Sequence, residues 1–90
     1  MKTIILNFRD CKYFDQVHDV LKEAFDFPEY YGKNLSALWD CLDDYCENDT
    51  KIIISGIDEM PEESQEYMQK ILNIFKRLNT KNTSIVYDVV

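Results

Sequence analysis

Three short apolar runs mark the predicted strands of this 90-residue chain. Residues 3–8 include Ile, Ile and Leu in succession, residues 52–54 are three isoleucines, and residues 84–90 include Ile, Val, Tyr and Val. Residues branched at Cβ are common in strands, and an unbroken apolar run is typical of a strand covered on both faces. Ser55 and Gly56 end the second run with turn-forming residues. We therefore predict three strands, the first two of them buried.

Residues 12–25 are predicted to form the first helix. Within this range apolar side chains recur at the spacing of a single helix face, at Phe14, Val17, Leu21 and Ala24. Asp10 is placed to cap the helix, and Pro28 requires that the helix end before it. His18 lies beside the apolar stripe, where a histidine is more often packed or hydrated than functional.

A loop over residues 29–33 leads to the second predicted helix, and Gly32 gives this loop backbone freedom. Asn34 belongs to the residue types favoured at a helix N-cap. Leucines then follow at helical spacing and are expected to face the core, at Leu35, Leu38 and Leu42.

Pro61 suits the first position of the third predicted helix, and Glu62 and Glu63 suit its first turn. The apolar face of this helix is predicted to consist of Tyr67, Met68, Ile71, Leu72, Phe75 and Leu78. The basic residues that suit its carboxyl end are Lys76, Arg77 and Lys81.

Strands separated by helices in the order β, α, α, β, α, β require crossover connections, which are right-handed in nearly all proteins. The predicted fold is therefore α/β, a small three-stranded parallel sheet packed with three to four α-helices. The chain is 46% hydrophobic and 13% aromatic, enough apolar material for one compact core. We expect a single domain over residues 1–90, with no linker.

The charge balance favours a cationic protein partner. The chain has 17 Asp and Glu against 10 Lys and Arg, a net charge of −7, which argues against direct binding to nucleic acid. The alternative is that the acidity only maintains solubility. The apolar run at the amino terminus is too short for a signal peptide, and no segment approaches the roughly 20 apolar residues that span a bilayer. We expect a cytoplasmic protein that does not bind membranes.

The residues do not form a recognisable catalytic or metal site. His18 is the only histidine, and the spacing of Cys11, Cys41 and Cys46 matches no zinc or haem pattern. We expect all three thiols to be reduced, as is usual in the cytosol. No glycine-rich phosphate loop is present, and the abundant carboxylates cannot be told from a hydrated acidic face by spacing alone. The prediction is a protein without enzymatic activity, cofactor or metal.

The second helix is one-sided in charge. Residues 34–50 contain five carboxylates and no Lys or Arg. At about 100° per residue, the face opposite the leucines carries Ser36, Asp40, Asp43 and Asp44. Carboxylates three and four residues apart repel by roughly 0.2 to 0.5 kcal/mol each, and those near the helix carboxyl end also oppose the macrodipole. Because this arrangement lowers the stability of the folded protein, it suggests that these carboxylates have a functional role.

Aromatic residues flank the same surface: Tyr30 and Tyr31 before the helix, Trp39 within it and Tyr45 at its end. Tyr and Trp are enriched among the anchor residues of protein interfaces. Tyr31 and Trp39 could equally close the core against the first helix. The combination of tyrosines and a one-sided acidic helix favours an interface.

Residues 27–42, Phe-Pro-Glu-Tyr-Tyr-Gly-Lys-Asn-Leu-Ser-Ala-Leu-Trp-Asp-Cys-Leu, resemble the signature of the barstar family. The length and element order resemble that family over nearly the whole chain. The resemblance implies a barstar-like fold and an intracellular inhibitor of a ribonuclease. It also implies that Asp40 takes the place of a substrate phosphate among the Arg, Lys and His of the enzyme. Tyr30, Asn34, Trp39 and Tyr45 would belong to the same contact surface.

The sequence departs from the family pattern at three positions. Ser36 stands where the best-known member has an acidic residue, Tyr45 replaces a tryptophan, and Arg77 stands where an acidic contact is expected. Like or unpaired charges at an interface oppose binding, so we expect weaker inhibition of barnase itself, with partial compensation by Asp43 and Asp44.

Three classes of function remain open from the sequence. The leading hypothesis is a monomeric inhibitor that binds a basic ribonuclease or a nuclease toxin in a 1:1 complex. The alternative is an adaptor or immunity protein of the same fold that binds another basic protein or toxin. A small hydrolase that uses carboxylates is the third class, and it predicts turnover.

Overall fold

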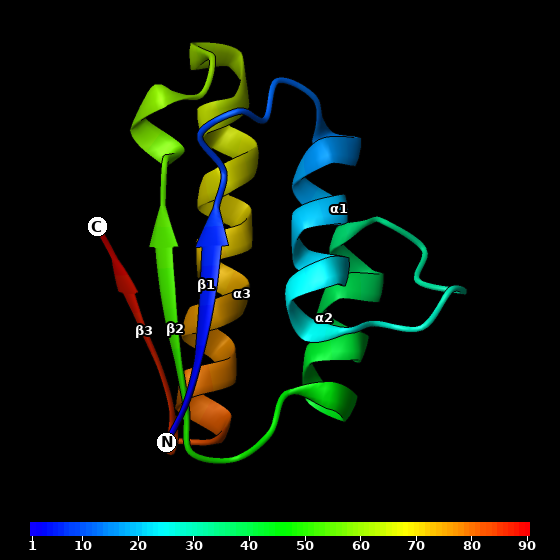
Figure 1. Ribbon diagram of the computed structural model, residues 1–90, viewed down its shortest axis with the longest axis vertical. Coiled ribbons are helices and arrows are strands. Elements are labelled where there is room, and N and C mark those ends of the chain that lie inside the picture. Colours follow the sequence, from blue (N-terminus) through cyan, green and yellow to red (C-terminus); the bar gives the residue numbers. More distant parts are fainter.

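The computed structural model describes residues 1–90 and confirms the predicted α/β fold (Figure 1). The strands are β1 (Lys2–Asn7), β2 (Thr50–Ser55) and β3 (Ile85–Val89). The helices are α1 (Phe14–Phe25), α2 (Leu35–Tyr45) and α3 (Gln65–Lys81), and two 3₁₀ turns, η1 (Ile57–Glu59) and η2 (Glu62–Ser64), join β2 to α3. The element order is therefore the predicted one.

The sheet is parallel, and its strands lie in the order β1-β2-β3. Ile4 of β1 lies opposite Ile52 of β2, which lies opposite Tyr87 of β3. When each strand is added on the same side of the previous one, right-handed crossovers place every helix on the same face of the sheet. The helices are seen beside and behind the strands in Figure 1.

This topology corrects the prediction that the first strand is covered on both faces. In β1, Ile4 and Leu6 are buried, whereas the intervening Ile5 is 65% exposed. Successive side chains of a strand point to opposite faces, and only one face of this sheet carries helices. The apolar run of β1 is therefore half buried, although its composition is that of a fully covered strand.

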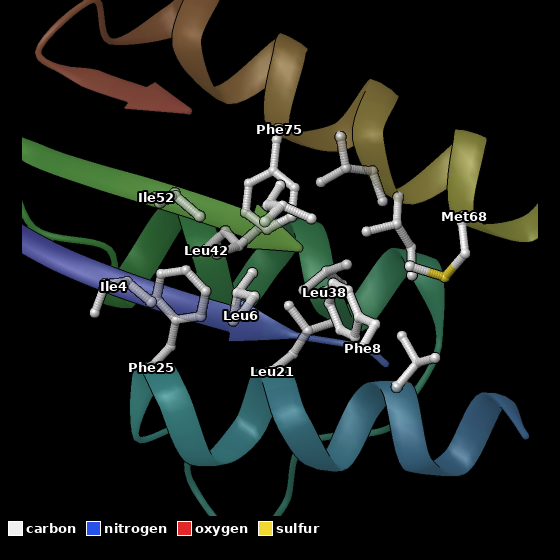
Figure 2. Close-up of a cluster of buried hydrophobic side chains, with 14 of the residues drawn as sticks. Ile4, Leu6, Phe8, Leu21, Phe25, Leu38, Leu42, Ile52, Met68 and Phe75 are labelled. Atoms are coloured by element: carbon white, nitrogen blue, oxygen red, sulfur yellow. The ribbon is translucent and has the colours of Figure 1, made fainter. Parts of the chain in front are cut away.

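A single core fills the space between the sheet and the helices. Figure 2 shows side chains from all three helices meeting those of the two neighbouring strands, among them Leu21, Phe25, Leu38, Leu42, Met68 and Phe75 over Ile4, Leu6 and Ile52. Ile74 of α3 is also buried, and the predicted apolar face of that helix had omitted it. No helix combines the length and the apolar character that crossing a membrane requires.

Two predicted helix starts are corrected. The α1 helix begins after Tyr13, not near Asp10, because Gln16 Oε1 accepts hydrogen bonds from the backbone N–H groups of Lys12 and Tyr13 at 2.7 and 3.0 Å. Gln16 is the third residue of the helix, and its side chain reaches back to the N–H of the N-cap residue Tyr13, as the third residue of a capping box does. Pro61 precedes the η2 turn instead of opening α3, and α3 itself begins at Gln65.

Candidate partner-binding surface

The α2 helix displays the two faces that the sequence predicted. Its N-cap is Asn34, whose Oδ1 accepts a hydrogen bond of 2.8 Å from the backbone N–H of Ala37. Leu38 and Leu42 are fully buried, whereas the opposite face is exposed over Ser36, Asp40, Asp43 and Asp44. Burial of one face fixes the rotation of the helix about its axis. The direction in which the carboxylates point is therefore set by the core.

The exposed carboxylates of α2 differ in their partners. The Lys81 Nζ atom at the end of α3 lies 2.5 Å from Asp43 Oδ1. Asp40 and Asp44 have no Lys, Arg or His nitrogen within 4.0 Å. The ion pair relieves part of the predicted repulsion at Asp43. It leaves Asp40 as an unpaired carboxylate near the middle of the helix.

Trp39 lies at the boundary between α2 and α3, half-buried. The guanidinium carbon of Arg77 lies 4.4 Å from the centre of its ring, and Lys81 Nζ lies 5.7 Å from it. A groove of about 460 Å³ runs beside this stack, and the residues that line it include Ser36, Trp39, Asp40, Lys70, Asn73 and Arg77. Four predicted binding residues from two helices thus meet at one concave surface.

Tyr30 and Tyr45 form a second cluster at the other end of α2. Their hydroxyl oxygens are 2.9 Å apart, and the two residues are 77% and 42% exposed. This hydrogen bond is the main cause that raises the pKa of Tyr45 above its usual value. Tyr30 therefore extends from the loop as an exposed ring whose polar end is already bonded, a typical form of interface anchor.

The loop that carries Tyr30 is fastened to α1 by two ion pairs. Lys33 Nζ lies 2.7 Å from Asp19 Oδ1, and Lys22 Nζ lies 3.1 Å from Glu29 Oε2. The predicted role of Gly32 is corrected, because the residue in the left-handed region is Lys33, with φ of 51°. Among the predicted binding residues, Asn34 uses its oxygen for the cap and donates its amide to the Gly32 carbonyl at 3.3 Å. Its side chain is thereby committed within the chain.

His18 is buried at the base of this loop and joins it to the core. Its Nδ1 and Nε2 atoms each lie 2.5 Å from a tyrosine hydroxyl, that of Tyr31 in the loop and that of Tyr67 in α3. A neutral imidazole fits this position because it donates through one nitrogen and accepts through the other. Burial is the largest cause that lowers the pKa of His18 below its usual value. The sequence prediction of a flanking residue missed this network.

We expect the stability of the protein to fall as the pH decreases from about 7 towards 5.5, because His18 takes up a proton more readily in the unfolded chain. A histidine with a lowered pKa in the folded state stabilises the fold above its unfolded pKa, and this contribution is lost as the pH falls below that value. The slope from this one residue is at most about 1.4 kcal/mol per pH unit. Urea unfolding at several pH values measures it.

The control for this prediction is His18→Gln, which keeps a donor and an acceptor but does not titrate. The variant should show a smaller decrease in unfolding free energy over the same pH range. An equal decrease in the variant would assign the pH dependence to other groups.

Sequence reasoning missed the contribution of α3 to this surface beyond Arg77. Lys70 and Asn73 also line the groove, and Lys81 holds Asp43. The available signal was the spacing of Lys70, Arg77 and Lys81, which repeats at close to whole turns of a helix and so places them on one side of α3.

Comparison with known proteins bears on this surface. Residues 1–89 match the family described as Barstar (barnase inhibitor). The protein named "Putative ribonuclease inhibitor YrdF" from Bacillus subtilis (strain 168) is 33% identical over 87 residues, which covers 84% of this chain and 96% of that protein. Together with the βααβαβ parallel fold, these similarities show that the chain belongs to the barstar family.

Proposed function

We propose that this protein inhibits a ribonuclease by placing the exposed face of α2 in the cationic active site of the enzyme. The observation that carries the proposal is Asp40. It is exposed and unpaired in a chain that otherwise forms six ion pairs, and it lies at the edge of the groove beside Trp39. Its carboxylate takes the role of an RNA phosphate, and the protein itself catalyses no reaction.

The physical basis of this inhibition is preorganisation. The capped and half-buried α2 helix holds Asp40 in place before binding, so little conformational entropy is lost at the interface. A net charge of −7 attracts a basic enzyme over distance and accelerates association. Trp39 lies beside the carboxylate in the groove, and Tyr30 and Tyr45 extend the contact surface at the carboxyl end of α2, so that aromatic rings exclude water around the charge pairs once the complex forms. The complex is proposed to contain one molecule of each protein.

The cellular setting of the proposal is the cytoplasm, where an inhibitor protects its producer from its own nuclease. Cys11 and Cys41 are buried and Cys46 is half-buried, and none of the three forms a disulfide. This state suits a reducing compartment.

Inhibition is tested by titrating the protein into a barnase-type ribonuclease and following hydrolysis of a fluorogenic RNA. We expect activity to fall in proportion to added protein up to one equivalent. We also expect the association rate constant to drop by at least about tenfold between 0.05 and 0.5 M salt, because screening removes the long-range attraction. Lysozyme, a basic protein that is not a ribonuclease, serves as the control and should not be bound.

The alternative function is that of an adaptor or immunity protein which binds another basic protein or toxin. The observation that favours it is the mixed character of the surface, where Ser36 is uncharged and Arg77 is cationic. This alternative predicts that titration into the ribonuclease gives neither heat of binding nor loss of RNA hydrolysis. The same titration, read by calorimetry alongside the activity assay, separates the two functions.

A further inference from the structure

Ion pairing in this protein leaves a distinct set of cations without partners. Six of the ten Lys and Arg side chains lie within 4.0 Å of a carboxylate oxygen. The remaining four are Lys12, Lys70, Lys76 and Arg77. Three of these four belong to α3, in a chain that has carboxylates in excess. The unpaired cations are therefore concentrated in one place.

That place is the far side of the groove that Asp40 borders. Lys70 and Arg77 line the groove together with Asp40, and Lys76 lies in an adjoining hollow of about 360 Å³ that also contains Trp39 and Arg77. The α3 helix has no Asp or Glu after Glu66. The surface is therefore acidic along α2 and basic along α3, with Trp39 between the two.

Arg77 is held in position without being neutralised. Its guanidinium group lies over the Trp39 ring, and such stacking leaves the N–H groups at the edge of the guanidinium plane able to donate. Those N–H groups fit the two oxygens of one carboxylate. Asp40 lines the same groove but lies beyond ion-pair distance from Arg77. The groove thus keeps opposite charges apart.

The helix macrodipole alone does not account for this arrangement. Cations are favoured in the last turn of a helix, which explains Lys81 and contributes at Lys76 and Arg77. Lys70 lies near the middle of α3, more than two turns from its end, where the dipole has little effect. An enzyme surface that is cationic throughout would meet Lys70 and Arg77 as like charges.

We infer that this surface selects a ribonuclease whose cationic active site is bordered by a carboxylate, which seats in the groove against Lys70 and Arg77 while Asp40 enters the cationic site. This inference rests on the proposed function and deepens it, because it makes Arg77 a specificity-determining residue. The cationic part of the enzyme is attracted to the acidic face of α2. The bordering carboxylate distinguishes the enzyme that fits this protein from one that does not.

The probe for this inference is barnase, together with a set of barnase variants in which single Arg or Lys residues at the border of its active site are replaced by Glu. Dissociation constants are measured by calorimetry, so that catalytically impaired enzymes can be included. We expect the wild-type protein to bind at least one of these variants about tenfold or more tightly than it binds barnase. Arg77→Glu should reverse that preference, and Lys70→Glu, which leaves the Trp39 stack intact, should reduce it.

Lys12→Glu is the matched control, because Lys12 is also unpaired and its replacement changes the net charge by the same amount, away from the groove. Its enzyme preference should equal that of the wild type. The inference is overturned if Arg77→Glu and Lys70→Glu leave the order of preference unchanged, and the proposed function then still stands if Asp40→Ala weakens binding. Failure of every enzyme in the set to bind would instead reject both.

Discussion

Replacing Asp40 by alanine should weaken binding to the target ribonuclease by about 2 to 5 kcal/mol, roughly 30-fold to several thousand-fold. Measurements on barnase and its inhibitor contributed to this range of binding free energies. Most of the effect comes from the enzyme, whose cations lose their partner after they have been removed from water. Since truncation removes a contact made only in the complex, the change should appear chiefly as faster dissociation.

The same substitution should leave the fold intact or slightly stabilise it. Asp40 is exposed and forms no ion pair within the chain, and its removal relieves repulsion with Asp43 and Asp44 by a few tenths of a kcal/mol. Binding kinetics and urea unfolding of one preparation measure both effects.

Asp58→Ala provides the matched control for Asp40→Ala. Asp58 is an exposed aspartate of the η1 turn and forms no ion pair. Its removal changes the net charge equally, so it should alter the association rate slightly and the dissociation rate not at all. If both variants bound the enzyme alike, the surface of α2 would not be the inhibitory site.

Substituting two isoleucines in the sheet should give very different losses of stability. Ile52→Ala should lower the unfolding free energy by about 2 to 5 kcal/mol, because Ile52 is fully buried beneath the helices and its truncation leaves a cavity. Ile5→Ala should lower it by less than about 1 kcal/mol, because Ile5 is 65% exposed on the uncovered face and loses only strand propensity and partial burial.

Chemical unfolding of both variants measures the difference, and an unchanged denaturant slope shows that the folded and unfolded states are comparable. Since Ile5 and Ile53 lie opposite each other in the sheet, Ile53→Ala, at a half-buried position, should fall between the two. Equal losses for Ile5 and Ile52 would mean that the outer face of the sheet is covered in solution.

Local features of the fold follow from the sequence because they depend on neighbours within a few residues. The three strands, the three helices and the Asn34 cap are of this kind. So is the division of α2 into a leucine face and a carboxylate face, since the period of a helix alone determines which side chains share a side. The exposed position of Asp40 was therefore accessible from the sequence.

The path of the chain decided the rest. Whether Ile5 is buried depends on which face of the sheet the crossovers cover, and the apolar run of β1 is the same in either case. Asp43 and Lys81 are 38 residues apart and meet only because α3 packs beside α2. His18 likewise joins residues from α1, the following loop and α3. By itself the sequence determined which residues share a strand or helix face. Only the tertiary structure decided which charges are neutralised within the chain and which remain for a partner, because pairing requires side chains distant in sequence to come within a few ångströms.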